Sequence, residues 1–183
     1  MKTMYLKIAA AILITTSFVV ICGCQNQASK DELKQFKSIA QVQNQNKEIV
    51  REFFSAIDGN KFDRLNELFS NDFALKAPGI ETSWKKEDVF QAIKSHYASF
   101  PDWTHNIEDM IAEGEKVAVK ITQIGTHQAQ YKGIVATGKK VTNPSISIMT
   151  IVNGQIKDWW VIEDNLGFMK QLGMELKPIE EKK

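Results

Sequence analysis

The chain has few of the residues that build disulfide scaffolds, metal sites or strongly charged surfaces. Its 183 residues include 2 cysteines and 3 histidines, and their spacing is not that of a zinc site. Lysine and arginine number 23 against 22 acidic residues, which gives a formal charge of +1. Such a balance offers no basic surface for nucleic acid or for an anionic membrane. A disulfide scaffold is therefore excluded, and no nucleic-acid partner is expected.

The chain also lacks an apolar run long enough for a transmembrane helix. Residues 8–22 form an uncharged, largely apolar run of 15 residues, preceded by Lys2 and Lys7. A membrane-spanning helix needs about 20 such residues. A basic start followed by a short apolar run is typical of a secretory signal peptide. An uncleaved N-terminal anchor helix is the alternative reading of the same run.

The end of this run resembles the lipobox of bacterial lipoproteins, in which a small residue precedes a cysteine that receives a lipid. Residues 21–24 read Ile-Cys-Gly-Cys, so Gly23 is the small residue and Cys24 the lipidated one. Cys22 fits less well because the bulky Ile21 precedes it. The resemblance implies a lipoprotein signal peptide over residues 1–23. The protein would then be exported and anchored to the bacterial membrane, in the cell envelope, through a lipid on Cys24.

Composition divides the rest of the chain into a tether, one folded domain and a tail. Residues 24–45 are rich in glutamine, asparagine and lysine and are expected to form a tether, part of which has apolar residues at helical spacing. The folded domain is expected over residues 46–174, and residues 175–183 form a charged tail. Apolar residues three and four apart predict three helices between residues 46 and 100.

After Trp103 the apolar period changes from about 3.6 to 2, which indicates strands. Strands are predicted over residues 103–112, 117–122, 141–152 and 155–163, with a further strand-like segment from about Thr126 to Ile134. Asn153 and Gly154 between the last two strands are a strong two-residue hairpin signal. Three helices followed by antiparallel strands predict an α+β fold, in which a curved sheet wraps the helices and leaves a pocket at one end.

Several spaced motifs recur in one known family. They are Gly-Thr-His at 125–127, Thr-Gly-Lys-Lys-Val at 137–141 and Trp-Trp-Val-Ile-Glu-Asp-Asn at 159–165. Over roughly residues 46–173 the chain resembles the SnoaL-like polyketide cyclases and related ester cyclases of the nuclear-transport-factor-2-like, or cystatin-like, superfamily. The resemblance implies a cone-shaped, curved antiparallel sheet packed on three N-terminal helices. It implies no metal and no organic cofactor.

The resemblance also implies site residues. In the cyclases a pocket aspartate near the end of the last long strand acts as general acid and base, and Asp164 holds that position. His127 corresponds to a pocket histidine that binds or polarises the substrate. The period of 2 places Trp160 and Ile162 on the face of Asp164, where they and Trp103 would bind the substrate. Read from the residues alone, Asp164 could instead cap the last helix.

Two functions follow as hypotheses. The first is an enzyme that cyclises or isomerises a small carbonyl compound by acid–base chemistry without a cofactor. The second is a non-catalytic exported lipoprotein that binds an apolar small ligand or a protein partner in the cone. The sequence leaves open whether the domain forms a homodimer.

Overall fold

The computed structural model describes the backbone of residues 2–177 and the side chains of residues 29–177. The chain divides into two compact units, Met1–Val42 and Gln43–Lys183. The predicted signal peptide and Cys24 lie outside the residues whose side chains are described. Where side chains are described, no helix combines the length and the apolar character needed to cross a membrane.

The first unit is helical. It belongs to α1 (Lys2–Asp58), which also supplies the first helix of the second unit. The stripe predicted in the tether is present on this helix, and its side chains are exposed: Leu33 by 54%, Phe36 by 68% and Ile39 by 43%.

Three helical segments carry the inner apolar side chains of the second unit. The last turns of α1 bury Val50, Phe53 and Ile57, and the helix ends at Asp58 before a turn in which Asn60 has a φ of 51°. The short α2 (Phe62–Leu68) and the longer α3 (Lys86–Ser99) follow. These segments pack with the sheet in one hydrophobic cluster.

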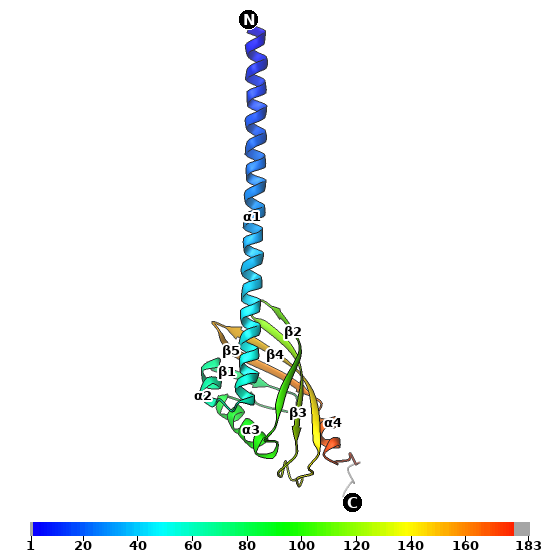
Figure 1. The fold of residues 1–183 in the computed structure, drawn as a ribbon. Coiled ribbons are helices and arrows are strands. Elements are labelled where there is room, and N and C mark those ends of the chain that lie inside the picture. Colours follow the sequence, from blue (N-terminus) through cyan, green and yellow to red (C-terminus); the bar gives the residue numbers. More distant parts are fainter. Residues whose placement is uncertain (1, 178–183) are drawn as a thin grey trace, which may run out of the picture. The chain divides into compact units, whose positions relative to one another are not determined.

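The sheet has five strands in the order β1-β5-β4-β3-β2. They are β1 (Phe69–Lys76), β2 (Thr104–Glu113), β3 (Lys116–Thr126), β4 (Lys140–Val152) and β5 (Gln155–Glu163), and α4 (Asn165–Gln171) follows β5. Figure 1 shows how the sheet curves. The predicted α+β architecture of helices packed on a curved sheet is confirmed. Only the pairing of β1 differs from the antiparallel prediction, because this strand pairs with β5 in the parallel direction.

Two loop predictions have different outcomes. The hairpin at Asn153 and Gly154 is confirmed, since both residues have positive φ, 51° and 78°. The segment after Thr126 is a loop rather than a strand, with one bridge between Tyr131 and Ile134. Lys132 lies between these two residues with a φ of 47°, and this tight turn prevents the segment from extending.

A β-bulge in β5 decides which of its side chains face the helices. Ile151 of β4 pairs with Ile156, but the preceding Thr150 pairs with Asp158, so that Lys157 is an extra residue. The alternation beyond the bulge is therefore shifted by one position. Trp159, Val161 and Glu163 face inward, and Asp158, Trp160 and Ile162 face outward. The prediction that Trp160 and Ile162 lie on the substrate-binding face of the strand is wrong for this reason.

The interior contains two hydrophobic clusters. The larger joins α1, α2 and α3 to the sheet. The smaller is centred on five buried residues of α3's end, β4 and α4, namely Phe100, Trp103, Val141, Phe168 and Leu172. Both lie within the second unit, and its buried hydrophobic side chains run from Val50 to Leu172.

We predict that residues 46–174 fold cooperatively on their own, because every buried hydrophobic side chain that the structure describes lies within this span. A domain of about this size buries roughly two-thirds of its unfolded surface. Thermal unfolding of this fragment, followed by circular dichroism, should give one transition near that of the chain starting at residue 24. Loss of the cooperative transition, or its restoration only by a metal, would contradict the prediction.

Candidate functional site

A band of polar side chains crosses the inner face of the sheet. It consists of Gln123 on β3, Asn143, Ser145 and Ser147 on β4, and Glu163 on β5. Asn143 and Ser145 are only 4% and 5% exposed. On β4 the band lies between the apolar inward residues of the two hydrophobic clusters. We call these five residues the polar band.

One hydrogen bond shows that the members of the band lie close together. Gln123 Nε2 donates to Glu163 Oε1 at 3.2 Å. Their strands are not neighbours, because β4 runs between β3 and β5, and two strand spacings amount to about 9.6 Å. The two side chains therefore meet over β4. There Asn143 is the pairing partner of Gln123, and Ser145 is the partner of Glu163.

Two buried atoms of the band have no hydrogen-bond partner in the structure. They are Asn143 Oδ1 and Ser145 Oγ. By contrast, the neighbouring Ser147 Oγ accepts a hydrogen bond of 2.9 Å from Trp159 Nε1. An unpaired buried polar atom costs about 1–3 kcal/mol. A bound molecule that supplies a donor to Asn143 and an acceptor to Ser145 would remove this cost.

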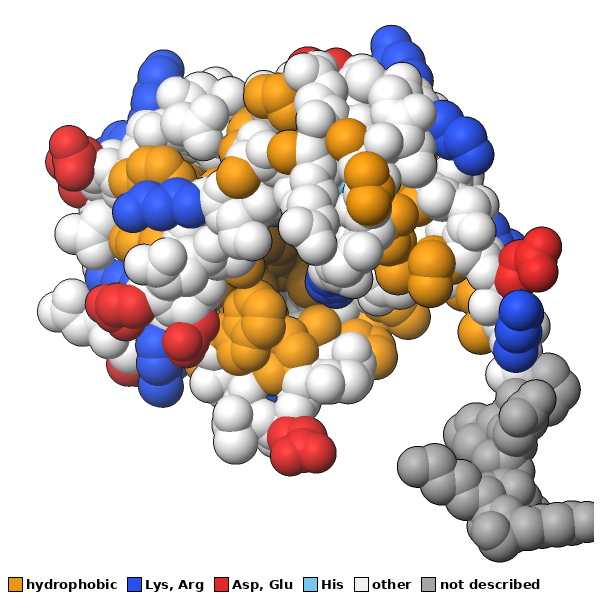
Figure 2. All heavy atoms as spheres, turned by 90° about the horizontal axis from the view of Figure 1, so that it is seen from below, with side chains coloured by type: hydrophobic (Ala, Val, Ile, Leu, Met, Phe, Trp, Pro, Cys, Tyr) orange, Lys and Arg blue, Asp and Glu red, His pale blue; other side chains and the backbone are white. Residues whose placement is uncertain are grey.

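The end of the domain near the polar band is hollowed. In Figure 1, β3 ends, β4 begins and α4 follows β5 at the lower end of the domain. Figure 2 shows this end from below, with a central depression bordered in part by hydrophobic side chains. A depression of this kind, with a few polar groups set among apolar ones, is the usual form of a small-molecule site.

Trp103 belongs to the smaller hydrophobic cluster, and His127 is buried against Phe100 of the same cluster. His127 is fully buried, with its ring 5.0 Å from that of Phe100. Its Nδ1 accepts a hydrogen bond of 3.2 Å from the backbone N–H of Thr137, and its Nε2 has no partner. Trp103 is 4% exposed, and the centre of its ring lies 5.2 Å from that of Phe100. The structure thus brings the two predicted residues together around one phenylalanine.

A second histidine, His96, is half-buried and packs on the same phenylalanine. The ring of His96 stacks on Phe100 at 4.8 Å, and its Nε2 is also without a partner. Burial, together with the nearby His105 and Lys132, lowers the pKa of His96 to about 4. His96 is therefore neutral at neutral pH. Among the described residues, no three His, Cys, Asp or Glu side chains are grouped closely enough to hold a metal ion.

Comparison with known proteins gives the family. The profile of the family described as SnoaL-like polyketide cyclase matches residues 47–172. The chain belongs to this family. Among solved structures, IdmH of Streptomyces antibioticus, a proposed polyketide cyclase, is 24% identical with a TM-score of 0.66, over 70% of this chain and 99% of IdmH. AclR of Streptomyces galilaeus, a proposed hydroxylase, is 21% identical with a TM-score of 0.66. The match covers 72% of this chain and 97% of AclR. No functionally curated protein sequence matches the chain.

In this SnoaL-like domain Asp164 lies at the surface, which corrects its predicted place in a pocket. Asp164 is exposed, and its Oδ1 accepts a hydrogen bond of 2.8 Å from the backbone N–H of Gly167. It is the N-cap of α4, so the capping alternative describes its position. A Cβ on Gly167 would collide with the carboxylate, and glycine permits this close approach.

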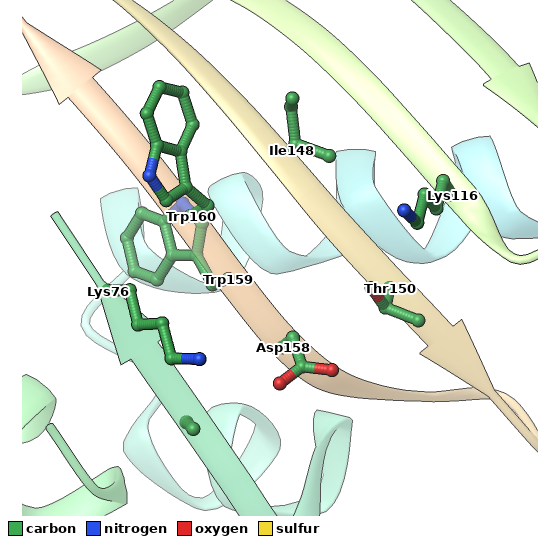
Figure 3. Close-up of a pocket in the computed structure, with 8 residues that line it drawn as sticks. Lys76, Lys116, Ile148, Thr150, Asp158, Trp159 and Trp160 are labelled. Carbon is green, nitrogen blue, oxygen red and sulfur yellow. The ribbon is translucent and has the colours of Figure 1, made fainter. Parts of the chain in front are cut away.

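Trp160 and Ile162 lie on the outer face of the sheet, away from His127, and this too corrects the prediction. They are 40% and 43% exposed. Trp160 lines a groove of about 320 Å³ on this face. In Figure 3 Lys76 of β1 and Lys116 of β3 flank the groove, with Asp158 between them. The bulge at Lys157 is the physical reason for the outward position of both side chains.

The polar band of this SnoaL-like domain was not predicted, although the sequence carries a signal for it. Val141 and Met149 are apolar residues of the predicted strand 141–152, and the period of 2 places Asn143, Ser145 and Ser147 on the same face as these two. Three consecutive polar residues on the inward face of a strand mark either a buried network or a site. Glu163 could not be found in this way, because its face depends on the bulge.

We predict that His96 makes the domain less stable in mild acid. Its pKa in the folded state, about 4, is below the value of about 6.5 in an unfolded chain. Between these values the unfolded chain binds the proton and the folded chain does not, so the free energy of unfolding falls as the pH falls. The full loss is about 3 kcal/mol, at about 1.4 kcal/mol per pKa unit.

The measurement is urea unfolding of the wild type and of His96→Phe at pH 6.5 and pH 4. The phenylalanine keeps a ring against Phe100 but cannot titrate. We expect the wild type to lose more stability than the variant between the two pH values. An equal loss in both proteins would show that other groups cause the acid sensitivity.

Proposed function

We propose that this SnoaL-like domain binds a small carbonyl compound over the polar band and cyclises or isomerises it by acid–base chemistry without a cofactor. One observation carries the proposal. Asn143 Oδ1 and Ser145 Oγ are buried without partners beside the Gln123–Glu163 hydrogen bond, and the end of the domain near them is hollowed. Membership of the SnoaL-like family supports the type of reaction.

The arrangement suits a ligand with two kinds of polar group. The hydroxyl of Ser145 would donate to a carbonyl oxygen, which makes the carbon next to that carbonyl more acidic. Asn143 Oδ1 would accept a hydrogen bond from a hydroxyl or enol of the same molecule. The two hydrophobic clusters on either side of the band would contact apolar or aromatic parts. A planar compound with carbonyl and hydroxyl groups meets all of these conditions.

The alternative is a non-catalytic domain that binds an apolar ligand or a protein partner in the cone. The position of Asp164 favours this alternative, because the residue predicted as the base is exposed and caps a helix. The predicted export also favours it. Under this alternative the polar band would orient the ligand without transferring a proton.

We further propose that the domain is exported and held at the bacterial membrane by a lipid on Cys24. The support is in the sequence: a short apolar run preceded by Lys2 and Lys7, and Gly23 directly before Cys24. Two or more acyl chains anchor a protein stably, whereas one alone binds weakly. The membrane is thus the proposed partner of the N-terminal end.

For the anchor, we expect Cys24→Ala to accumulate as unprocessed precursor that incorporates no labelled palmitate in bacterial cells. Cys22→Ala is the matched control and should be processed and labelled like the wild type. The assignment would be refuted if the Cys24 variant incorporated labelled palmitate, or if only the Cys22 variant failed to incorporate it.

For the site, we predict that Ser145→Ala weakens binding without destabilising the fold. The substitution removes an unpaired buried hydroxyl, so the melting temperature should stay the same or rise. Ser147→Ala is the matched control. It breaks the hydrogen bond with Trp159 and should lower the free energy of unfolding by about 1 kcal/mol.

The probe is 2-tetralone, a bicyclic ketone with one aromatic ring, titrated by calorimetry. Its affinity should fall about tenfold in Ser145→Ala, the equivalent of about 1.4 kcal/mol. Equal affinity in the wild type and Ser145→Ala would show that the ligand does not bind at the polar band.

A further inference from the structure

We infer that Glu163, and not its neighbour Asp164, is the carboxylate that transfers the proton inside the cone. The inference rests on the proposed function, because it names the base of the same site. It changes the residue that the family motif indicates.

The strand geometry separates the two neighbouring carboxylates. Successive residues of a strand point to opposite faces. Beyond the bulge, Val161 is buried on the inner face and Glu163 shares that face, whereas Asp164 follows the end of β5. Only Glu163 therefore comes from the strand into the polar band.

The contacts of Glu163 suit a proton acceptor. Gln123 Nε2 holds Oε1 at 3.2 Å, while Oε2 accepts no hydrogen bond from the residues that the structure describes. Across the strand pair stands Ser145, whose Oγ has no partner. One carboxylate oxygen is thus fixed, and the other is available beside a hydroxyl that can bind a carbonyl oxygen.

The contacts of Asp164 suit a structural residue. Its Oδ1 accepts the backbone N–H of Gly167 at the first turn of α4, and the side chain is exposed. A carboxylate in this position satisfies a backbone N–H group of the first helical turn that would otherwise have no partner. It has no buried polar group of the band as a hydrogen-bond partner.

The step can be written with all atoms and charges balanced. The Glu163 carboxylate takes a proton from the carbon next to the ligand's carbonyl, and the electron pair of that C–H bond forms an enolate whose oxygen is bound by Ser145. The enolate carbon attacks a second carbonyl of the same molecule, which forms a C–C bond and an alkoxide. The alkoxide takes the proton back from Glu163. The ligand is neither oxidised nor reduced, and no co-reactant is used.

The test follows exchange of the α-protons of 2-tetralone for deuterium by NMR in D₂O, because this exchange needs only the first proton transfer. Glu163→Gln is nearly isosteric and keeps an oxygen that can accept from Gln123. We expect its exchange rate to fall at least about 100-fold, the lower range for loss of a general base. Its affinity for 2-tetralone, measured by calorimetry, should stay within about threefold of the wild type.

Asp164→Ala and Asp164→Asn are the matched variants. The alanine should lower the melting temperature, since loss of an N-cap costs about 1 kcal/mol, and the asparagine should not, since it caps equally well. Both should keep the wild-type exchange rate within about threefold. If Glu163→Gln does not fold, Gln123→Leu tests the same site: its exchange rate should fall while its melting temperature is retained.

The outcomes separate the inference from the proposed function. If the wild type exchanges the protons and Asp164→Asn abolishes the exchange while Glu163→Gln does not, the inference is wrong and the proposed enzyme remains. If the wild type binds 2-tetralone without accelerating exchange, the catalytic function itself is refuted. The inference is supported only if exchange depends on Glu163 and binding does not.

Discussion

The bulge at Lys157 is the constraint on which the interior depends. A shift of one residue in a strand moves every later side chain to the other face. Here it brings Trp159 inward, where its ring lies 5.0 Å from that of Phe53 and its Nε1 donates to Ser147. The same shift sends Trp160 to solvent. The packing of Trp159 thus favours the bulged register, and the register in turn sets the direction of Glu163.

The polar band lowers the stability of the domain, because two of its buried atoms lack hydrogen-bond partners, and the fold does not require polar residues there. An apolar side chain at Asn143 or Ser145 would join the two hydrophobic clusters into one and would leave no unpaired atom. Natural proteins depart from such a consistent core mainly where a site needs it. The surroundings of Phe100 show the same feature, because His96 and His127 pack on its ring and each bury an Nε2 without a partner. The buried polar side-chain atoms left unpaired in the described residues therefore lie on the inner face of the sheet or around Phe100.

Sequence periodicity was sufficient for the fold and insufficient for the site. The alternation in β3 and β4 and the Asn153–Gly154 turn have strong local signals, and each forms as predicted. The bulge has none, since residues 155–163 contain no glycine or proline to mark it. Its position depends on tertiary packing of Trp159, which a period of 2 cannot reveal. The faces of Trp160 and Ile162 were therefore assigned wrongly, although the strand itself was predicted correctly.

The neighbouring residues Glu163 and Asp164 show how one short motif can serve two purposes. AclR and IdmH share this fold, yet one is a proposed hydroxylase and the other a proposed cyclase, so the fold leaves the activity to the residues of the interior. In this chain the strand ends with an inward carboxylate, and the next residue caps α4. The cap fixes where the helix begins, and this in turn fixes where β5 stops. The position of the inward carboxylate at the end of the strand therefore depends on the capping carboxylate beside it.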